Sequence, residues 1–164
     1  MTSLQKDMLI YQEQLQQGAV QRAYKGLLEY LLSLRTHFQK NYPDYSVPGS
    51  LYTGYMDMSY FSIVPADLKQ RGLKIALVFL HEAMRFEVWL SAYNKQVQSE
   101  YWQRIRQNGW EKYRLVPELA GADSILEYVL IEHPDFSDLE TLTSTIEQGT
   151  IAFISDVQKF LKPL

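Results

Sequence analysis

Four side chains suited to binding or proton transfer fall on two extended segments of the chain. Arg85, Glu87 and Trp89 occupy alternate positions, and side chains two residues apart lie on the same face of a strand. We expect Asp57, from an earlier extended segment, to lie on that face as well. A guanidinium group binds anions in a fixed geometry, and an indole ring offers a flat apolar wall. These residues predict a polar sheet face that binds a small anionic or aromatic ligand, or a protein partner.

The same side chains would also support acid–base catalysis. Glu87 or Asp57 would act as the general base while Arg85 stabilises an anion, giving a small hydrolase or transferase that needs no metal. The sequence contains no Gly-x-Ser-x-Gly elbow, phosphate-binding glycine loop or dinucleotide fingerprint. A restriction-endonuclease-like nuclease would need a lysine two residues after the glutamate, where this chain has Trp89. We therefore favour a binding or interaction protein over an enzyme and expect no cofactor.

A structural interpretation of the polar face stays open beside these two. Arg85 would then pair with Glu87 or Asp57 in a salt-bridge network, and Trp89 would only cover the sheet. The binding hypothesis predicts that Arg85→Ala weakens ligand or partner binding and leaves the melting temperature nearly unchanged. A fall of many degrees would mark Arg85 as structural, because an unpaired buried charge is very costly.

Tyrosines gather just before these strands. Five lie within nineteen positions: Tyr42, Tyr45, Tyr52, Tyr55 and Tyr60. Tyrosine is common at interfaces and pocket mouths, although half-buried strands also favour it. We expect Tyr55 to join the ligand-binding face.

Composition narrows the class of protein. The 164 residues carry a net charge of −3 and no cysteine, which argues against a general nucleic-acid binder and excludes disulfides and thiolate sites. No apolar run approaches the roughly 18 residues of a membrane helix, and the first residues lack a secretory pattern, so we expect a cytoplasmic protein. Residues 69–114 hold nine basic side chains against four glutamates. That excess indicates either solvated helix ends or a basic face for an anionic partner.

The three histidines, His37, His81 and His133, show no metal-ligand spacing. We expect no metal site, and we expect His81 to be solvated at the tip of a hairpin.

The best-defined element is that hairpin, formed by residues 73–92 folded about positions 82–83. In this register one face is wholly apolar, with three facing pairs: Phe79 and Phe86, Leu77 and Val88, Ile75 and Leu90. A slip of one residue would bury Arg85 and Glu87, so the register is well specified.

A long strand is predicted at about 52–64. Its alternation suggests that Met56, Met58 and Tyr60 point to the core, with Asp57 and Ser59 on the face of Arg85. Two shorter strands are expected near 113–116 and 125–131.

Capping signals and apolar periodicity predict the helices. Thr2 with Gln5 begins the first, which carries an apolar stripe of Leu4, Met8, Tyr11 and Leu15 and ends at Gly18. A second helix follows at 19–40 with a buried stripe that begins at Val20 and Ala23. Asn94 caps a helix to about 107. Ser137 with Glu140 begins another helix, Gly149 interrupts it, and a last helix follows.

These elements predict one α+β domain over residues 1–164. An N-terminal helical pair precedes a mostly antiparallel sheet with a long strand and a hairpin, and further helices pack on that sheet. The oligomeric state stays open between monomer and homodimer.

Several sequence stretches resemble a family of uncharacterised bacterial proteins. They are Arg-Ala-Tyr (22–24), Leu-Arg-Thr-His-Phe (34–38), Gly-Tyr-Met-Asp-Met (54–58), Arg-Phe-Glu-Val-Trp-Leu (85–90), Tyr-Asn-Lys-Gln-Val-Gln (93–98) and Pro-Asp-Phe-Ser-Asp-Leu (134–139). The resemblance spans nearly the whole chain. It implies an intact single domain and adds no mechanism.

Overall fold

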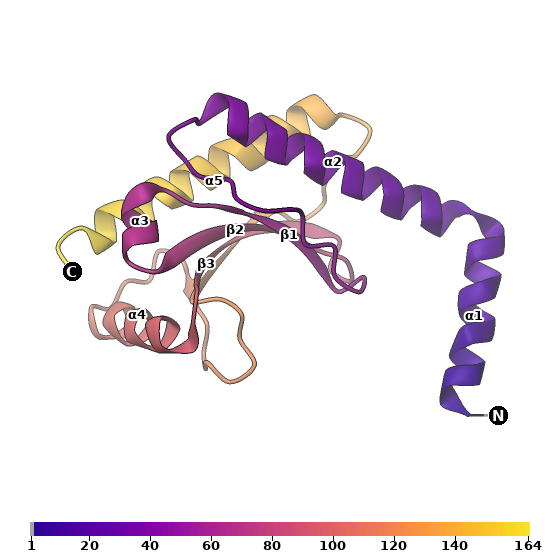
Figure 1. Ribbon diagram of the computed structural model, residues 1–164, viewed down its shortest axis with the longest axis horizontal. Coiled ribbons are helices and arrows are strands. Elements are labelled where there is room, and N and C mark those ends of the chain that lie inside the picture. Colours follow the sequence, from indigo (N-terminus) through magenta and orange to yellow (C-terminus); the bar gives the residue numbers. More distant parts are fainter. Residues whose placement is uncertain (1) are drawn as a thin grey trace.

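Helices lie on both faces of one antiparallel sheet in the computed structural model, which describes residues 2–164 (Figure 1). The helices are α1 (Ser3–Gln17), α2 (Ala19–Asn41), α3 (Ala66–Gln70), α4 (Lys95–Gln107) and α5 (Leu139–Leu161). The strands are β1 (Met58–Ile63), β2 (Leu73–Leu80), β3 (Arg85–Ala92), β4 (Arg114–Leu115) and β5 (Leu126–Ile131), in the order β1-β2-β3-β5-β4. α2 and α5 cover one face, and α4 lies on the other. The predicted α+β class is confirmed.

The central hairpin has the predicted register. Phe79 faces Phe86, and the pairs on either side along β2 and β3 follow in step. Tight turn residues 81–84 join the strands, and Met84 adopts a left-handed backbone with φ of 52°. The apolar face of this hairpin is therefore continuous and packs entirely into the hydrophobic core.

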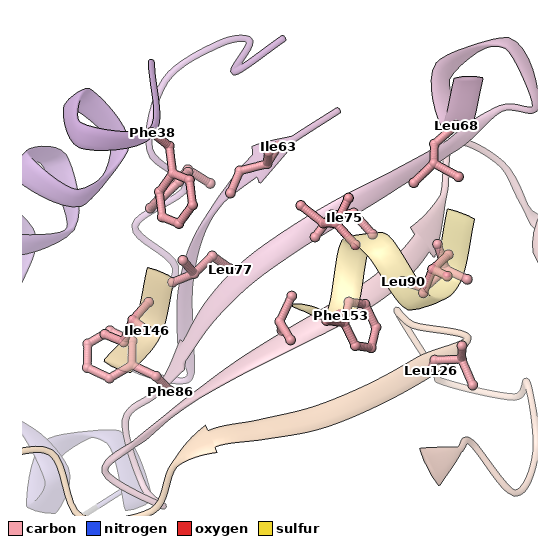
Figure 2. Packing of buried hydrophobic residues seen from close by; sticks show 14 of the residues in the cluster. Phe38, Ile63, Leu68, Ile75, Leu77, Phe86, Leu90, Leu126, Ile146 and Phe153 are labelled. Carbon is pink, nitrogen blue, oxygen red and sulfur yellow. The ribbon is translucent and has the colours of Figure 1, made fainter. Parts of the chain in front are cut away.

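That face packs against α2 and α5 to form the hydrophobic core (Figure 2). Leu77 and Phe86 from the hairpin lie near Ile146 of α5, Phe153 of α5 lies farther along the sheet toward Leu90, and Phe38 of α2 lies near Ile63. All of these side chains are fully buried. Each such burial contributes about 1.5–3 kcal/mol before conformational entropy is counted. A second, smaller cluster around Ala76, Val78 and Trp89 lies on the opposite face.

The structure shows the two faces of the first strand in the opposite arrangement to the predicted one. β1 begins only at Met58, and its odd residues Phe61 and Ile63 are buried in the main core. Met58 and Tyr60 instead pack on the opposite face, so the expected core positions were wrong. The cause is a turn over residues 54–57, where Gly54 and Met56 both have positive φ. Residues before that turn do not continue the strand's alternation.

The last helix also differs from the prediction. α5 runs unbroken through Gly149, and its N-cap is Asp138, whose carboxylate accepts the Thr141 amide at 3.1 Å. A Cβ at Gly149 would lie 2.6 Å from Leu130 Cδ2 of β5. The glycine therefore allows the helix to approach the sheet closely and does not end it. The expected capping by Ser137 and the expected break were both wrong.

Two carboxylates of α5 bind side chains from neighbouring segments. Glu147 accepts the Tyr42 hydroxyl at 2.6 Å and lies 2.7 Å from His37 Nε2. Burial, together with Glu147, raises the pKa of Tyr42 to about 12, so Tyr42 remains a donor. Asp156 accepts the Tyr113 hydroxyl at 2.6 Å. These bonds fasten α5 to the segments on either side of it.

α1 has the predicted N-cap, since Thr2 Oγ1 accepts the Gln5 amide at 3.3 Å, and it ends at Gly18 as expected. It extends away from the sheet, and none of its residues is buried (Figure 1). The α4 prediction is confirmed as well: Asn94 caps the helix, and Tyr101 and Ile105 are buried.

Val88→Asp tests the face assignment of the hairpin. Val88 is fully buried between the sheet and the helices, so a carboxylate there lacks any compensating partner. We expect a loss of more than about 4 kcal/mol in the free energy of unfolding, measured by urea denaturation. Ala83→Asp in the exposed turn is the matched control and should stay within about 0.5 kcal/mol of wild type. A stably folded Val88→Asp protein would contradict the assignment.

Candidate functional site

A hollow of about 570 Å³ lies on the face of the sheet that carries α4. β1, β2 and β3 supply its floor, and the segment that leads into α4 and the loop before β5 contribute to its wall. Ala76 and Trp89 face each other across β2 and β3, and both are nearly buried in the floor. The small alanine side chain leaves depth beside the indole ring. The rings of Tyr52 and Tyr60 lie at the rim, with centroids 4.9 Å apart.

Lys74 supplies a positive charge at the α4 end of this hollow. It lies opposite Ser91 in the hairpin, so it is on the same face as Trp89. Its ammonium group stands 5.3 Å from the centre of the Tyr93 ring. No carboxylate of residues 2–164 lies within 4.0 Å of it. Lys95, which also lines the hollow, donates to the Ala122 carbonyl at 3.1 Å.

The loop at residues 122–124 forms another wall of the hollow, and hydrogen bonds from β3 and α4 hold it in place. The buried Gln98 amide donates to the carbonyls of Ala122 at 3.0 Å and Ser124 at 3.1 Å. Ser91 Oγ donates to the Asp123 carbonyl at 3.0 Å. These bonds present the Asp123 side chain to the hollow. Burial raises the pKa of the Tyr60 hydroxyl, and Tyr52 and Asp123 raise it further, so Tyr60 stays a hydrogen-bond donor.

Arg85 and Glu87 belong to a separate charged network. Arg85 lies 3.0 Å from Glu132 and 3.6 Å from Glu87, and it does not line the hollow. Glu87 is only 3% exposed. Burial raises the pKa of Glu87, while the Arg85 charge opposes that rise. The Trp89 indole N–H is near enough to favour the charged form of Glu87, yet it does not reach hydrogen-bond geometry.

Asp57 lies at the rim of the hollow, in the turn before β1. Its carboxylate accepts the Tyr55 amide at 2.9 Å. Backbone amides of Tyr55 and Met58 lower the pKa of Asp57, which makes it a weak base. Tyr55 itself is 92% exposed and does not line the hollow. Of the five side chains predicted for a ligand site, the structure brings Asp57 and Trp89 to the hollow and leaves Arg85, Glu87 and Tyr55 outside it.

Sequence reasoning missed Lys74 and Gln98 as site residues and named Tyr60 only among the tyrosines common at pocket mouths. The alternation of β2 places Lys74 on the face of Trp89, and this signal was present in the hairpin register. The predicted core position of Tyr60 hid its contribution. Gln98 carried no signal, because only the folded loop shows which carbonyls it binds.

His81 is not solvated as expected. It is half-buried, and its Nε2 lies 2.9 Å from Ser59 Oγ. Burial lowers the pKa of His81, and nearby Asp57 partly offsets this. Ser59 is fully buried and donates its proton to the Thr53 carbonyl at 2.6 Å. The pair therefore fastens the hairpin tip to the 54–57 turn and does not prepare a serine nucleophile.

Within residues 2–164, no three histidine, aspartate or glutamate side chains converge as a metal ion would require. No helix in this part of the chain is long and apolar enough to cross a membrane.

Comparison with known families assigns the chain to one of them. Residues 4–161 match the model of the family described as a domain of unknown function (DUF7000), and the chain belongs to that family. No curated protein and no solved structure matched the chain. The resemblance to an uncharacterised family is thus confirmed, and the family carries no assigned activity.

Arg85→Ala separates the charged network from the hollow. The substitution leaves the buried Glu87 carboxylate without its nearest cation, so we expect the melting temperature to fall, in contrast to the unchanged value that the binding hypothesis predicts. We expect a loss of about 2 kcal/mol in the free energy of unfolding, reduced from a fully buried pair by partial solvent exposure. Arg114→Ala removes an exposed partner of Glu127 and should cost less than about 1 kcal/mol. Equal losses in the two variants would contradict this account.

Glu87→Gln tests the pH dependence of the same network. The pKa of Glu87 is raised in the folded state, so the folded protein binds this proton more tightly than the unfolded chain does. Stability from the protonated form is complete below the unfolded pKa and is lost as pH rises through the folded pKa. We expect the melting temperature of Glu87→Gln, relative to wild type, to increase as pH rises above about 4, the ordinary range of a glutamate pKa, and through the raised pKa of the folded state.

Glu132→Gln removes the other carboxylate bound to Arg85 and serves as the control for a lost ion pair. A relative melting temperature of Glu87→Gln that falls over this pH range would show that the Arg85 charge outweighs burial.

Proposed function

We propose that this protein binds a small molecule with a flat apolar body and an anionic group in the hollow beside α4. The single observation that carries the proposal is the Lys74 ammonium, which faces the hollow and has no carboxylate partner within residues 2–164. Ligand sites of this size combine apolar walls with a few polar groups that fix orientation. Ala76, Trp89 and Tyr60 provide such walls.

The arrangement of charge suggests how the ligand lies. The anionic group would contact Lys74 and Lys95 near the start of α4, where the helix dipole also favours negative charge. The flat body would rest on the floor at Trp89. The Tyr60 hydroxyl would donate a hydrogen bond to a polar substituent.

Binding is better supported than acid–base catalysis. Backbone amides keep the Asp57 carboxylate ionised and weakly basic. Glu87 is buried outside the hollow and paired with Arg85. Neither predicted base therefore meets a ligand in the hollow with a proton affinity suited to catalysis. A bacterial, cytoplasmic setting is part of this proposal, supported by the family resemblance and by a fold that needs no disulfide.

Lys74→Gln tests the proposal. Benzoate and phenyl phosphate are the probes, and benzyl alcohol is their neutral counterpart, with binding measured by isothermal titration calorimetry. We expect Lys74→Gln to weaken binding of the two anions roughly tenfold, as loss of a charge-assisted contact does. Lys69→Gln, on the exposed surface of α3, makes the same charge change outside the hollow and should bind as wild type does.

Native mass spectrometry of the purified protein complements the titration by revealing any retained ligand as mass that is lost on denaturation. Equal binding by Lys74→Gln and Lys69→Gln would contradict the proposed site. Benzyl alcohol bound as tightly as benzoate would contradict the proposed ligand class.

A further inference from the structure

The helix α1 exposes an apolar surface that nothing else in residues 2–164 covers. Leu4 is 70% exposed, Met8 49% and Tyr11 53%. With Leu15 they follow the helical spacing i, i+4, i+7 and i+11 and so lie along one side of the helix. A helix of 15 residues is marginal in water without tertiary packing. α1 therefore has the properties of an arm that docks on another surface.

An apolar groove of about 650 Å³ lies near the base of this arm. The first half of α2 forms one wall with Val20, Ala23 and Leu27, and the hairpin tip and the 54–57 turn form the other. Ala23 was expected to be buried, but it is exposed because the first turns of α2 reach past the edge of the sheet (Figure 1). The structure thus leaves an apolar acceptor surface open as well as an apolar arm.

We propose that α1 of one copy of this chain occupies the groove of a second copy, and that the exchange is reciprocal. An amphipathic helix binds an apolar groove through side chains at the i, i+4 and i+7 positions, which Leu4, Met8 and Tyr11 supply. The arm continues directly into the groove wall through Gly18, so each copy forms one bent apolar surface. Two such surfaces related by a two-fold axis close on each other without leaving a free end.

The junction between α1 and α2 keeps the arm from its own groove. Gly18 has φ of 78°, and its amide donates to the Leu15 carbonyl at 3.1 Å. The Gln21 side chain donates to the same carbonyl at 2.6 Å. A side chain at position 18 would meet Arg22 Nη1 at 2.7 Å. Folding the arm back on its own chain would break these contacts, whereas docking on a second copy preserves them.

The charges on the arm and on the groove also favour a second copy of the chain as the partner. Arg22 lines the groove, while Asp7 lies on the arm one residue before Met8, and neither has an ion-pair partner within the described residues. Reciprocal docking brings these opposite charges together. It also covers the exposed apolar side chains Leu4, Met8 and Tyr11 of both arms.

The rim of the groove carries adaptable side chains. Met56 and Met84 are 47% and 59% exposed, and both have positive φ, a conformation that residues other than glycine rarely adopt. Their long, unbranched side chains can reshape around an incoming helix.

Three variants test the exchange by light scattering coupled to size-exclusion chromatography. We expect wild type at twice the chain mass of 19.2 kDa. Met8→Glu on the arm and Ala23→Glu in the groove should each weaken dimerisation by more than about tenfold. Both positions are exposed on helices, so circular dichroism should show an intact fold. Lys6→Gln makes the same charge change on the far side of α1 and should remain dimeric.

Mixing the two damaged proteins distinguishes the mode of contact. A mixed dimer of Met8→Glu with Ala23→Glu contains one intact arm and one intact groove that meet, whereas each homodimer has two damaged junctions. Recovery of dimer on mixing supports arm-in-groove exchange. Lack of recovery overturns it in favour of contact between two arms. Wild type that stays monomeric at about 1 mM also overturns the proposal.

Discussion

The pairing of β2 with β3 is the constraint on which the rest of the molecule depends. Because side chains alternate along a strand, this single register sends Leu77, Phe79 and Val88 to the core and Ala76 with Trp89 to the opposite face. The hydrophobic core and the floor of the hollow are therefore two results of one arrangement. A change that shifted the register would lose both together, so stability and the candidate site cannot be separated at this hairpin.

Trp89 divides the polar face into two regions that differ in how their charges are paired. Toward β2 it borders the hollow, where Lys74 forms no ion pair with any of residues 2–164. Toward β5 it lies opposite Glu127, in the region where the partly exposed Arg85 pairs with the buried Glu87. One region holds a lysine without a carboxylate partner among residues 2–164, and the other neutralises charge within the chain. Arg85 and Glu87, which the sequence predicted as ligand-binding residues, lie in the region where charges pair within the chain.

Local signals in the sequence predicted much of the fold. The hairpin register, the Thr2 and Asn94 caps and the end of α1 at Gly18 follow from neighbouring residues and were found. Gly149 misled because its close contact with Leu130 comes from a distant strand. The faces of β1 were inverted because positive φ values in the preceding turn break its alternation. The hairpin register places Lys74 on the face of Trp89, but Tyr60 and Asp123 join Lys74 only after two other segments fold, so the shared hollow itself left no local pattern.

The hydrogen bonds from Tyr42 to Glu147 and from Tyr113 to Asp156 restrict how α5 can move. Glu147 and Asp156 are nine residues apart, which is two and a half turns, so they project from opposite flanks. Rolling the helix about its axis would pull one carboxylate from its tyrosine whichever way it turned. The helix is thus held at a fixed azimuth, with the bare side of Gly149 against Leu130. The two hydrogen bonds therefore oppose rotation of α5 about its own axis.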